Sequence, residues 1–320
     1  MKETLELPSF TAPAIRCRAA FLLVSLLSSI AWILTSGCSV KQTIKVEVPE
    51  AIRQAQTASY EELLGVLGGY DQINSLSCNK VTLTYTSSGK AEDGIFEILK
   101  KYKEVGAYIL LKRPDALRLV ARTPIIQSTL FDVISVGDDF SFWYPSENKI
   151  YEGKNSAREL IMEDSSGVKD FTDIPIRGPH IFEAIFPQSI VLDAPGIWVN
   201  EEEQTDERAS YYVLSVLKEG KRPRIHTIRK IWIERSGMTI ARQQVFEEDH
   251  VVSDVIYSDV VRMQGLSLPQ HIVIKRPVDK YTLDMTFKGW NINPDLPDDA
   301  FKLPTLPRDA QIIHLKDKEK

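Results

Sequence analysis

Side chains of the types used in catalysis are scattered along this chain of 320 residues. The histidines are His180, His226, His250, His271 and His314. None is paired at helical or strand spacing with another histidine or with a cysteine. The chain also holds no H-E-x-x-H, G-x-S-x-G, phosphate-loop or C-x-x-C motif. The run 247–250 offers cation ligands, but its position between two predicted strands favours a solvated turn. The spacing therefore predicts no catalytic residue, no metal site and no enzyme.

Cys38 is the residue whose surroundings indicate covalent chemistry. Arg16 and Arg18 precede a stretch without charged residues, 19–40, and this basic-then-apolar order is typical of a secretory signal. Small residues at 35–37 lead into the cysteine, as a lipoprotein signal peptidase requires. The thiol would be alkylated by a diacylglycerol, and cleavage would leave the cysteine as the new N-terminus.

The segment around Cys38 resembles a bacterial lipobox, with one departure. Thr35 stands where leucine or valine is usual. Two other interpretations remain: an uncleaved signal anchor, because the uncharged run is just long enough to span a bilayer, and ordinary signal cleavage. We predict a signal peptide over 1–37 and a lipid anchor, made of a diacylglycerol and acyl groups such as palmitate, on Cys38.

The net charge and the cysteines limit which binding partners and which disulfides the chain can have. The formal net charge of −5 gives no attraction to phosphate backbones, which argues against nucleic acid as a partner. Cys17 lies in the leader, so an acylated Cys38 leaves Cys78 without a disulfide partner. We expect Cys78 to be a small buried apolar residue. The length is sufficient for one large β-rich domain.

The pattern downstream of the anchor predicts a mainly β (α+β) fold. Residues 38–48 are polar and read as a membrane tether, and 49–70 predict a helix that ends at a glycine pair. About eleven strands follow, because apolar and polar residues alternate. We expect a single unclosed antiparallel β-barrel wrapped around a helical lid, with an N-terminal helix.

Two segments interrupt the strands, and a third ends the chain. Residues 157–186 break the alternation, and a short amphipathic helix is predicted near 181–186. The acidic run 201–208 is expected to be a surface loop. The charged end, 311–320, is expected to be a solvated tail, so the folded domain would span 49–310.

Three motifs resemble the lipoprotein-sorting carriers and receptors LolA and LolB. Tyr108–Leu119 is similar to the family's "K-R-P-[ND]-x-[LF]" strand-turn-strand. Ser135–Phe140 and Phe142–Pro145 are similar to its "S-D-G-x-x-[LF]-W-x-Y-x-P" hairpin. Leu296–Pro304 looks like its closing "A-x-x-F-x-[FL]-x-P" segment. The resemblance covers about 76–305 and is strongest at 106–153. Segment 187–210 is longer than the family usually has.

The resemblance implies a half-barrel whose apolar cavity holds lipoprotein acyl chains. The receptor branch is itself a lipoprotein with an exposed "N-P-L-G" loop that meets the membrane. Here the matching place is Thr123–Ile126, so Ile125 and Ile126 become membrane-contact candidates; an inward-facing turn is the alternative. The candidates for the cavity lining are Leu119, Phe131, Phe140, Phe142, Trp143, Ile185 and Phe186, each of which is alternatively an ordinary core residue.

The function expected from the sequence is the binding of acyl chains of lipoproteins, or of another amphiphile, by a lipid-anchored protein of the outer membrane that faces the periplasm. Its partners would be membrane lipid and a periplasmic carrier protein, and it would need no cofactor beyond the lipid on Cys38. A scaffold that docks a protein partner is the alternative. A hydrolase would require distant Ser, His and Asp residues to meet in the fold.

Overall fold

Strands make up most of the structure, a computed structural model that describes residues 55–87, 104–124, 126–157, 159–164, 167–171, 176–191, 194–207, 209–220, 224–304 and 309–318. The predicted signal peptide, Cys38, the tether and Ile125 lie outside these residues. Residues 48–320 form one compact unit. Within the described ranges no helix is long and apolar enough to cross a membrane.

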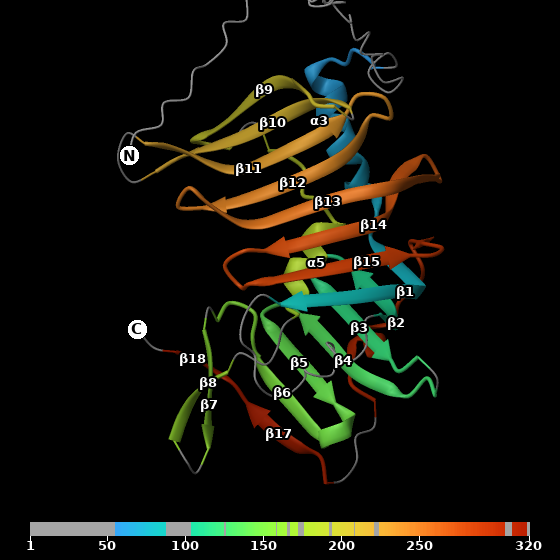
Figure 1. Cartoon of the computed structure of the whole chain (residues 1–320), viewed down its shortest axis with the longest axis vertical. Helices are drawn as coiled ribbons and strands as arrows, with labels where there is room; N and C mark the ends of the chain where they lie inside the picture. Colours follow the sequence, from blue (N-terminus) through green and yellow to red (C-terminus); the bar gives the residue numbers. More distant parts are fainter. Residues whose placement is uncertain are drawn as a thin grey trace, which may run out of the picture. The chain divides into compact units, whose positions relative to one another are not determined.

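A single large sheet of 15 strands dominates the fold (Figure 1). Its path runs in the order β17-β6-β5-β4-β3-β2-β1-β15-β14-β13-β12-β11-β10-β9, and β16 pairs with β1 alongside it. Neighbouring strands are antiparallel except that β17 runs parallel to β6. The strands are β1 (Ser75–Ser87), β2 (Val105–Lys112), β3 (Ala116–Arg122), β4 (Thr129–Val136), β5 (Asp139–Tyr144), β6 (Lys149–Lys154), β9 (Ile197–Thr205), β10 (Ser210–Glu219), β11 (Ile225–Glu234), β12 (Thr239–Glu247), β13 (His250–Met263), β14 (Leu266–Arg276), β15 (Tyr281–Phe287), β16 (Asn291–Ile292) and β17 (Gln311–His314).

The predicted mainly β, unclosed fold is confirmed, because β17 and β9 end the sheet without pairing with each other. The predicted number of about eleven strands is too low. The acidic run expected to be a loop continues β9 at the sheet edge, where its glutamates stay exposed. The end expected to be a tail supplies β17 and β18 (Lys316–Asp317), with Leu315 buried between them. Short polar edge strands lack the alternation by which the others are recognised.

Alternation divides the sheet into two faces. On β15 the side chains of Tyr281, Leu283, Met285 and Phe287 are buried, while the residues between them are half-exposed. We call this buried side the inner face and the other side the outer face. Inner-face side chains from β1 to β15 join one continuous apolar core. The inner face is therefore where a lid or an apolar ligand would lie.

Helix α3 (Tyr60–Gly68) precedes the first strand. Ser59 and Glu62 form a capping box, which satisfies two free backbone N–H groups and sets the start of the helix. Leu63 and Leu67 are fully buried, and the turn η1 (Gly69–Gln72) leads into β1. The prediction of a helix over 49–70 is therefore wrong for residues 55–59, because the capping residue Ser59 makes the helix begin at Tyr60.

The mid-chain insertion differs from the predicted helical lid. Its first part forms β7 (Leu160–Asp164) and β8 (Gly167–Phe171), which make a small sheet with β18. Its second part is helix α5 (Gly178–Ile185), near the predicted place. Figure 1 shows α5 behind the strands β14 and β15. The lid is thus one helix of two turns, and the apolar run at 160–162 is a strand.

Candidate functional site

Six of the seven predicted cavity residues meet on the inner face, from β3, β4, β5 and the end of α5. The rings of Phe131 and Phe142 stack with centroids 5.4 Å apart. The six, all at most 7% exposed, are Leu119, Phe131, Phe140, Phe142, Ile185 and Phe186. They belong to one apolar cluster to which both the sheet and the lid contribute.

Trp143 does not join the other six. It pairs with Asp132 of β4, and Asp132 accepts hydrogen bonds from Arg118 on the outer face. Since successive strand residues point to opposite faces, Trp143 lies on the side away from Phe142. The Trp143 side chain is half-buried, and its indole Nε1, which is buried, has no hydrogen-bond partner in the described structure. Trp143 is therefore removed from the predicted lining.

Helix α5 lies on the inner face, where the family resemblance implies an apolar cavity. Its residues Ile181, Ala184 and Ile185 are buried against the sheet. Gly178 permits this close approach, because a Cβ at that position would lie 2.3 Å from the Ser135 Cβ. The part of the inner face near β3, β4 and β14 is therefore covered by a short helix of the chain itself.

Between the described residues, few polar contacts hold α5 in place. The Tyr257 hydroxyl donates to the Ala184 carbonyl over 2.8 Å, and His180 Nδ1 lies 2.8 Å from the Tyr281 hydroxyl. Arg177 donates to the Ala157 carbonyl. Each such bond contributes on the order of 1 kcal/mol net. Docking of α5 depends mainly on its apolar side chains.

The charge on His180 is disfavoured in the docked position. Burial is the main cause that lowers its pKa well below the ordinary value, and the cations Arg276 and Arg177 add to the effect. The Tyr281 hydroxyl pKa is raised by burial. A neutral His180 is therefore part of the closed arrangement.

A polar strip borders the other side of α5. Arg229 on β11 donates to Gln243 on β12 through Nε and Nη2, at 3.1 and 2.5 Å. Burial lowers the Arg229 pKa to about 10. Glu183 keeps access to solvent, but the surrounding protein still raises the pKa of its carboxyl against the opposing effect of Arg276 and Arg229. This strip holds a hydrogen-bond network and no nucleophile–base pair.

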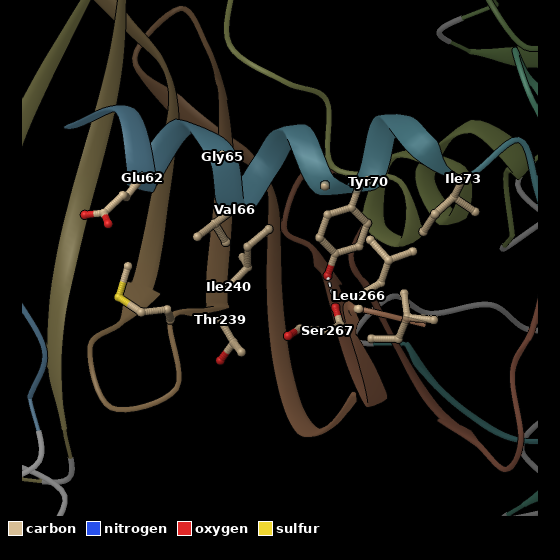
Figure 2. A pocket seen from close by; sticks show the side chains of 13 residues that line it. Glu62, Gly65, Val66, Tyr70, Ile73, Thr239, Ile240, Leu266 and Ser267 are labelled. Atoms are coloured by element: carbon tan, nitrogen blue, oxygen red, sulfur yellow. Dashed lines mark hydrogen bonds between the residues drawn. The ribbon is translucent and has the colours of Figure 1, made fainter. Parts of the chain in front are cut away.

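A groove opens beside α3, at the end of the inner face (Figure 2). Its volume is about 270 Å³, slightly below the 300–1,000 Å³ typical of small-molecule pockets. The Tyr70 hydroxyl crosses it to donate to the Ser267 carbonyl over 2.9 Å. Its apolar lining includes Val66, Ile73, Met238, Ile240, Leu266 and Leu268. Sequence patterns missed this groove because a helix and strands almost 200 residues apart build it.

The predicted membrane-contact loop joins β3 to β4. Thr123 and Ser128 close the loop through their backbone and hydroxyl groups. Ile126 projects from it with 79% of its surface exposed. Ile125 lies outside the described residues. The side chain of Ile126 is exposed to solvent and does not turn inward.

Ser258, His271 and Asp284, on the adjacent strands β13, β14 and β15, form a chain of hydrogen bonds. The Ser258 Oγ lies 2.9 Å from His271 Nδ1, and His271 Nε2 lies 2.8 Å from Asp284 Oδ1. The meeting of Ser, His and Asp that a hydrolase would require is therefore present, away from the apolar inner face.

The other candidates do not form a metal site, because within the described ranges no group of three or more His, Cys, Asp or Glu side chains is arranged to hold a metal ion. Residues 248–249 form the expected turn, with positive φ at both. Cys78 is buried, as predicted, at 1% exposure.

No protein-family model matches the chain, and neither does any curated protein. Solved structures that resemble it include a DUF1329 family protein from Desulfovibrio piger, with 12% identity, a TM-score of 0.46, and coverage of 78% of this chain and 100% of that one. A LolA superfamily protein from Nitrosomonas europaea has 13% identity, a TM-score of 0.43, and coverage of 75% and 96%. A putative outer membrane lipoprotein-sorting protein domain from Vibrio parahaemolyticus has 6% identity, a TM-score of 0.45, and coverage of 76% and 97%.

The structures that resemble this chain thus include a protein of the LolA superfamily, to which the sequence motifs show a resemblance. Because each of these TM-scores is below 0.5, we base the function on the residues of this chain alone.

Proposed function

We propose that the protein binds acyl chains of lipoproteins, or of another amphiphile, on the inner face of its sheet, where α5 acts as a displaceable lid. The observation that carries the proposal is the pairing of a continuous apolar face with a two-turn helix held by few polar contacts. The proposed binding is non-covalent and needs no catalytic side chain.

The free energy gained by burying the apolar side chains of α5 is of the same order as that gained by burying an acyl chain. Burial of the three large side chains Ile181, Ile185 and Phe186 contributes about 1.5–3 kcal/mol each, or roughly 5–9 kcal/mol together. An acyl chain that buries about 14 methylenes contributes ~0.8 kcal/mol for each, or roughly 11 kcal/mol. One chain can therefore replace the contacts that α5 makes. The groove beside α3 would supply an entry at the end of the same face.

The proposed location of the protein is the outer membrane. With a lipid on Cys38, the protein would act from the periplasmic side as an anchored acceptor, and a periplasmic carrier protein would deliver the cargo. Transfer would follow from the difference in affinity of two cavities for the same chains.

The first test is to purify the protein from its membrane, extract bound lipid and identify it by mass spectrometry, followed by titration with a fluorescent fatty acid. We expect acyl chains in the extract and saturable binding by the emptied protein. The variants Leu119→Thr and Val120→Thr form a matched pair, because both residues are buried on β3 but on opposite faces. The inner-face change at Leu119 should weaken binding of the fatty acid, and the change at Val120 should not. Equal effects, or an extract without lipid, would remove the inner face as the site.

A further inference from the structure

A hollow of about 310 Å³ lies on the outer face, on the opposite side of the sheet from α5. It is formed over β1, β2 and β3 and by the residue that follows β15. Three exposed cations line it, namely Lys80, Arg122 and Lys288, together with Thr82, Tyr108 and Gln127. None of its lining residues is acidic. In a chain with a net charge of −5, this hollow is a local concentration of positive charge.

The backbone explains why the hollow exists. The register of β1 against β2 shifts between Cys78 and Val81, and this irregularity brings Lys80 to the rim. The Lys288 N–H donates to the Lys80 carbonyl over 2.9 Å, which holds the two lysines on adjacent strands. Gly106 forms the floor, and a Cβ there would meet no atom within 4 Å. The space is therefore kept open by a missing side chain.

The three cations have no anionic partner in the described part of the chain. Arg118 and Arg122 both lie on β3. Arg118 forms an ion pair with Asp132 at 2.7 Å, whereas the Arg122 guanidinium lies over the Tyr108 ring, 5.1 Å from its centroid. No ion pair involves Lys80 or Lys288 among the described residues. Uncompensated Arg and Lys side chains that converge on one hollow suit an anion with several oxygens, above all a phosphate.

An exposed apolar side chain adjoins the hollow. Gln127 lines it, and the preceding residue, Ile126, is 79% exposed. Cations beside an exposed apolar residue are the combination by which peripheral proteins bind an anionic membrane. We propose that the hollow binds the phosphate of an anionic phospholipid headgroup while Ile126 contacts the acyl region. This docking surface is separate from the inner face and does not depend on cargo binding there.

A vesicle assay tests the site. The chain without its leader 1–37 carries Cys38→Ser, so that neither the apolar leader nor an acyl anchor contributes. It is mixed with vesicles of phosphatidylcholine alone or of phosphatidylcholine with phosphatidylglycerol. The anionic vesicles should be preferred. The double change Lys80→Gln with Lys288→Gln should weaken binding to them about 25-fold, because each cation near an anionic surface contributes about fivefold. The control Lys218→Gln with Lys275→Gln removes two other exposed lysines and should have a much smaller effect. Equal losses in the two pairs would overturn the proposal.

Gly106→Leu separates a built site from diffuse attraction, because it fills the hollow and leaves all three cations in place. We expect this variant to lose most of the preference for phosphatidylglycerol. An unchanged preference would show that charge alone is responsible and would overturn the headgroup site. Uptake of fatty acid should be unchanged in Gly106→Leu, so failure of this proposal and failure of the inner-face function are distinguishable.

Two further measurements, with the variant Ile126→Ser and with added inorganic phosphate, show whether the bound phosphate belongs to a lipid headgroup or is free in solution. If the occupant is a membrane headgroup, Ile126→Ser weakens vesicle binding, and excess inorganic phosphate lowers it only in part. If inorganic phosphate displaces the vesicles completely and Ile126→Ser has no effect, the hollow is a site for free phosphate, and docking on a membrane is refuted.

Discussion

Gly178→Ala should release the lid, because this glycine permits α5 to lie directly on β4. A Cβ at position 178 would be 2.3 Å from the Ser135 Cβ and 2.5 Å from its Oγ, whereas carbon atoms in contact are about 3.5–4.0 Å apart. The helix must therefore move by more than about 1 Å. Overpacking of this kind costs about 1–3 kcal/mol, which is a roughly 5- to 150-fold shift toward the undocked lid.

The readout is the affinity for a fluorescent fatty acid, measured beside a urea unfolding curve. If undocking of α5 limits binding, Gly178→Ala raises the affinity by the same factor by which it destabilises the docked helix. Ser135→Gly in the same chain should reverse most of the effect, although it also removes a hydrogen bond of 2.9 Å from Asn155 and adds the cost of a glycine in a strand, about 0.5–1 kcal/mol. The two changes should therefore be non-additive. A less stable Gly178→Ala variant with unchanged affinity would refute the lid, as would strictly additive effects.

Three further outcomes are expected. His180 has a folded-state pKa below its unfolded value near 6.5, so its contribution to stability is complete above about pH 6.5 and is lost as the pH falls below it. His180→Gln should flatten this loss in unfolding curves recorded from neutral pH into the acid range. Phe142→Ala should lower the free energy of unfolding by about 3–5 kcal/mol in urea titrations, because Phe142 is fully buried and stacked on Phe131. Ser59→Ala should cost about 0.5–2 kcal/mol in the same assay through the lost cap of α3, and Glu62→Ala less.

The sequence predicted the strands of the sheet interior well, because burial on one face imposes alternation. On β15 the four buried positions are those expected from the pattern. The same rule could have excluded Trp143 from the cavity lining, since it directly follows Phe142 in the strand. Parity in the strand decides which face Trp143 occupies, whereas its aromatic character does not.

The edges of the sheet could not be predicted in this way. β17 pairs with β6 through four residues, Gln311–His314, of which none is fully buried. β9 carries acidic side chains whose backbone completes the sheet beside β10. Pairing of such strands depends on free backbone groups of a neighbour that is distant in sequence, and residue types carry little of that information.

The candidate sites show the same division between what a pattern specifies and what it leaves open. Alternation specifies that Leu119 faces inward and Arg122 outward, but it says nothing about what covers either face. The position of the lid depends on the close approach of Gly178 to Ser135. The hollow depends on Gly106, which lies on the strand between those that carry Lys80 and Arg122. In both places a glycine decides whether two surfaces touch or remain apart. Substitutions at these two glycines therefore test the function more directly than changes to the larger residues around them.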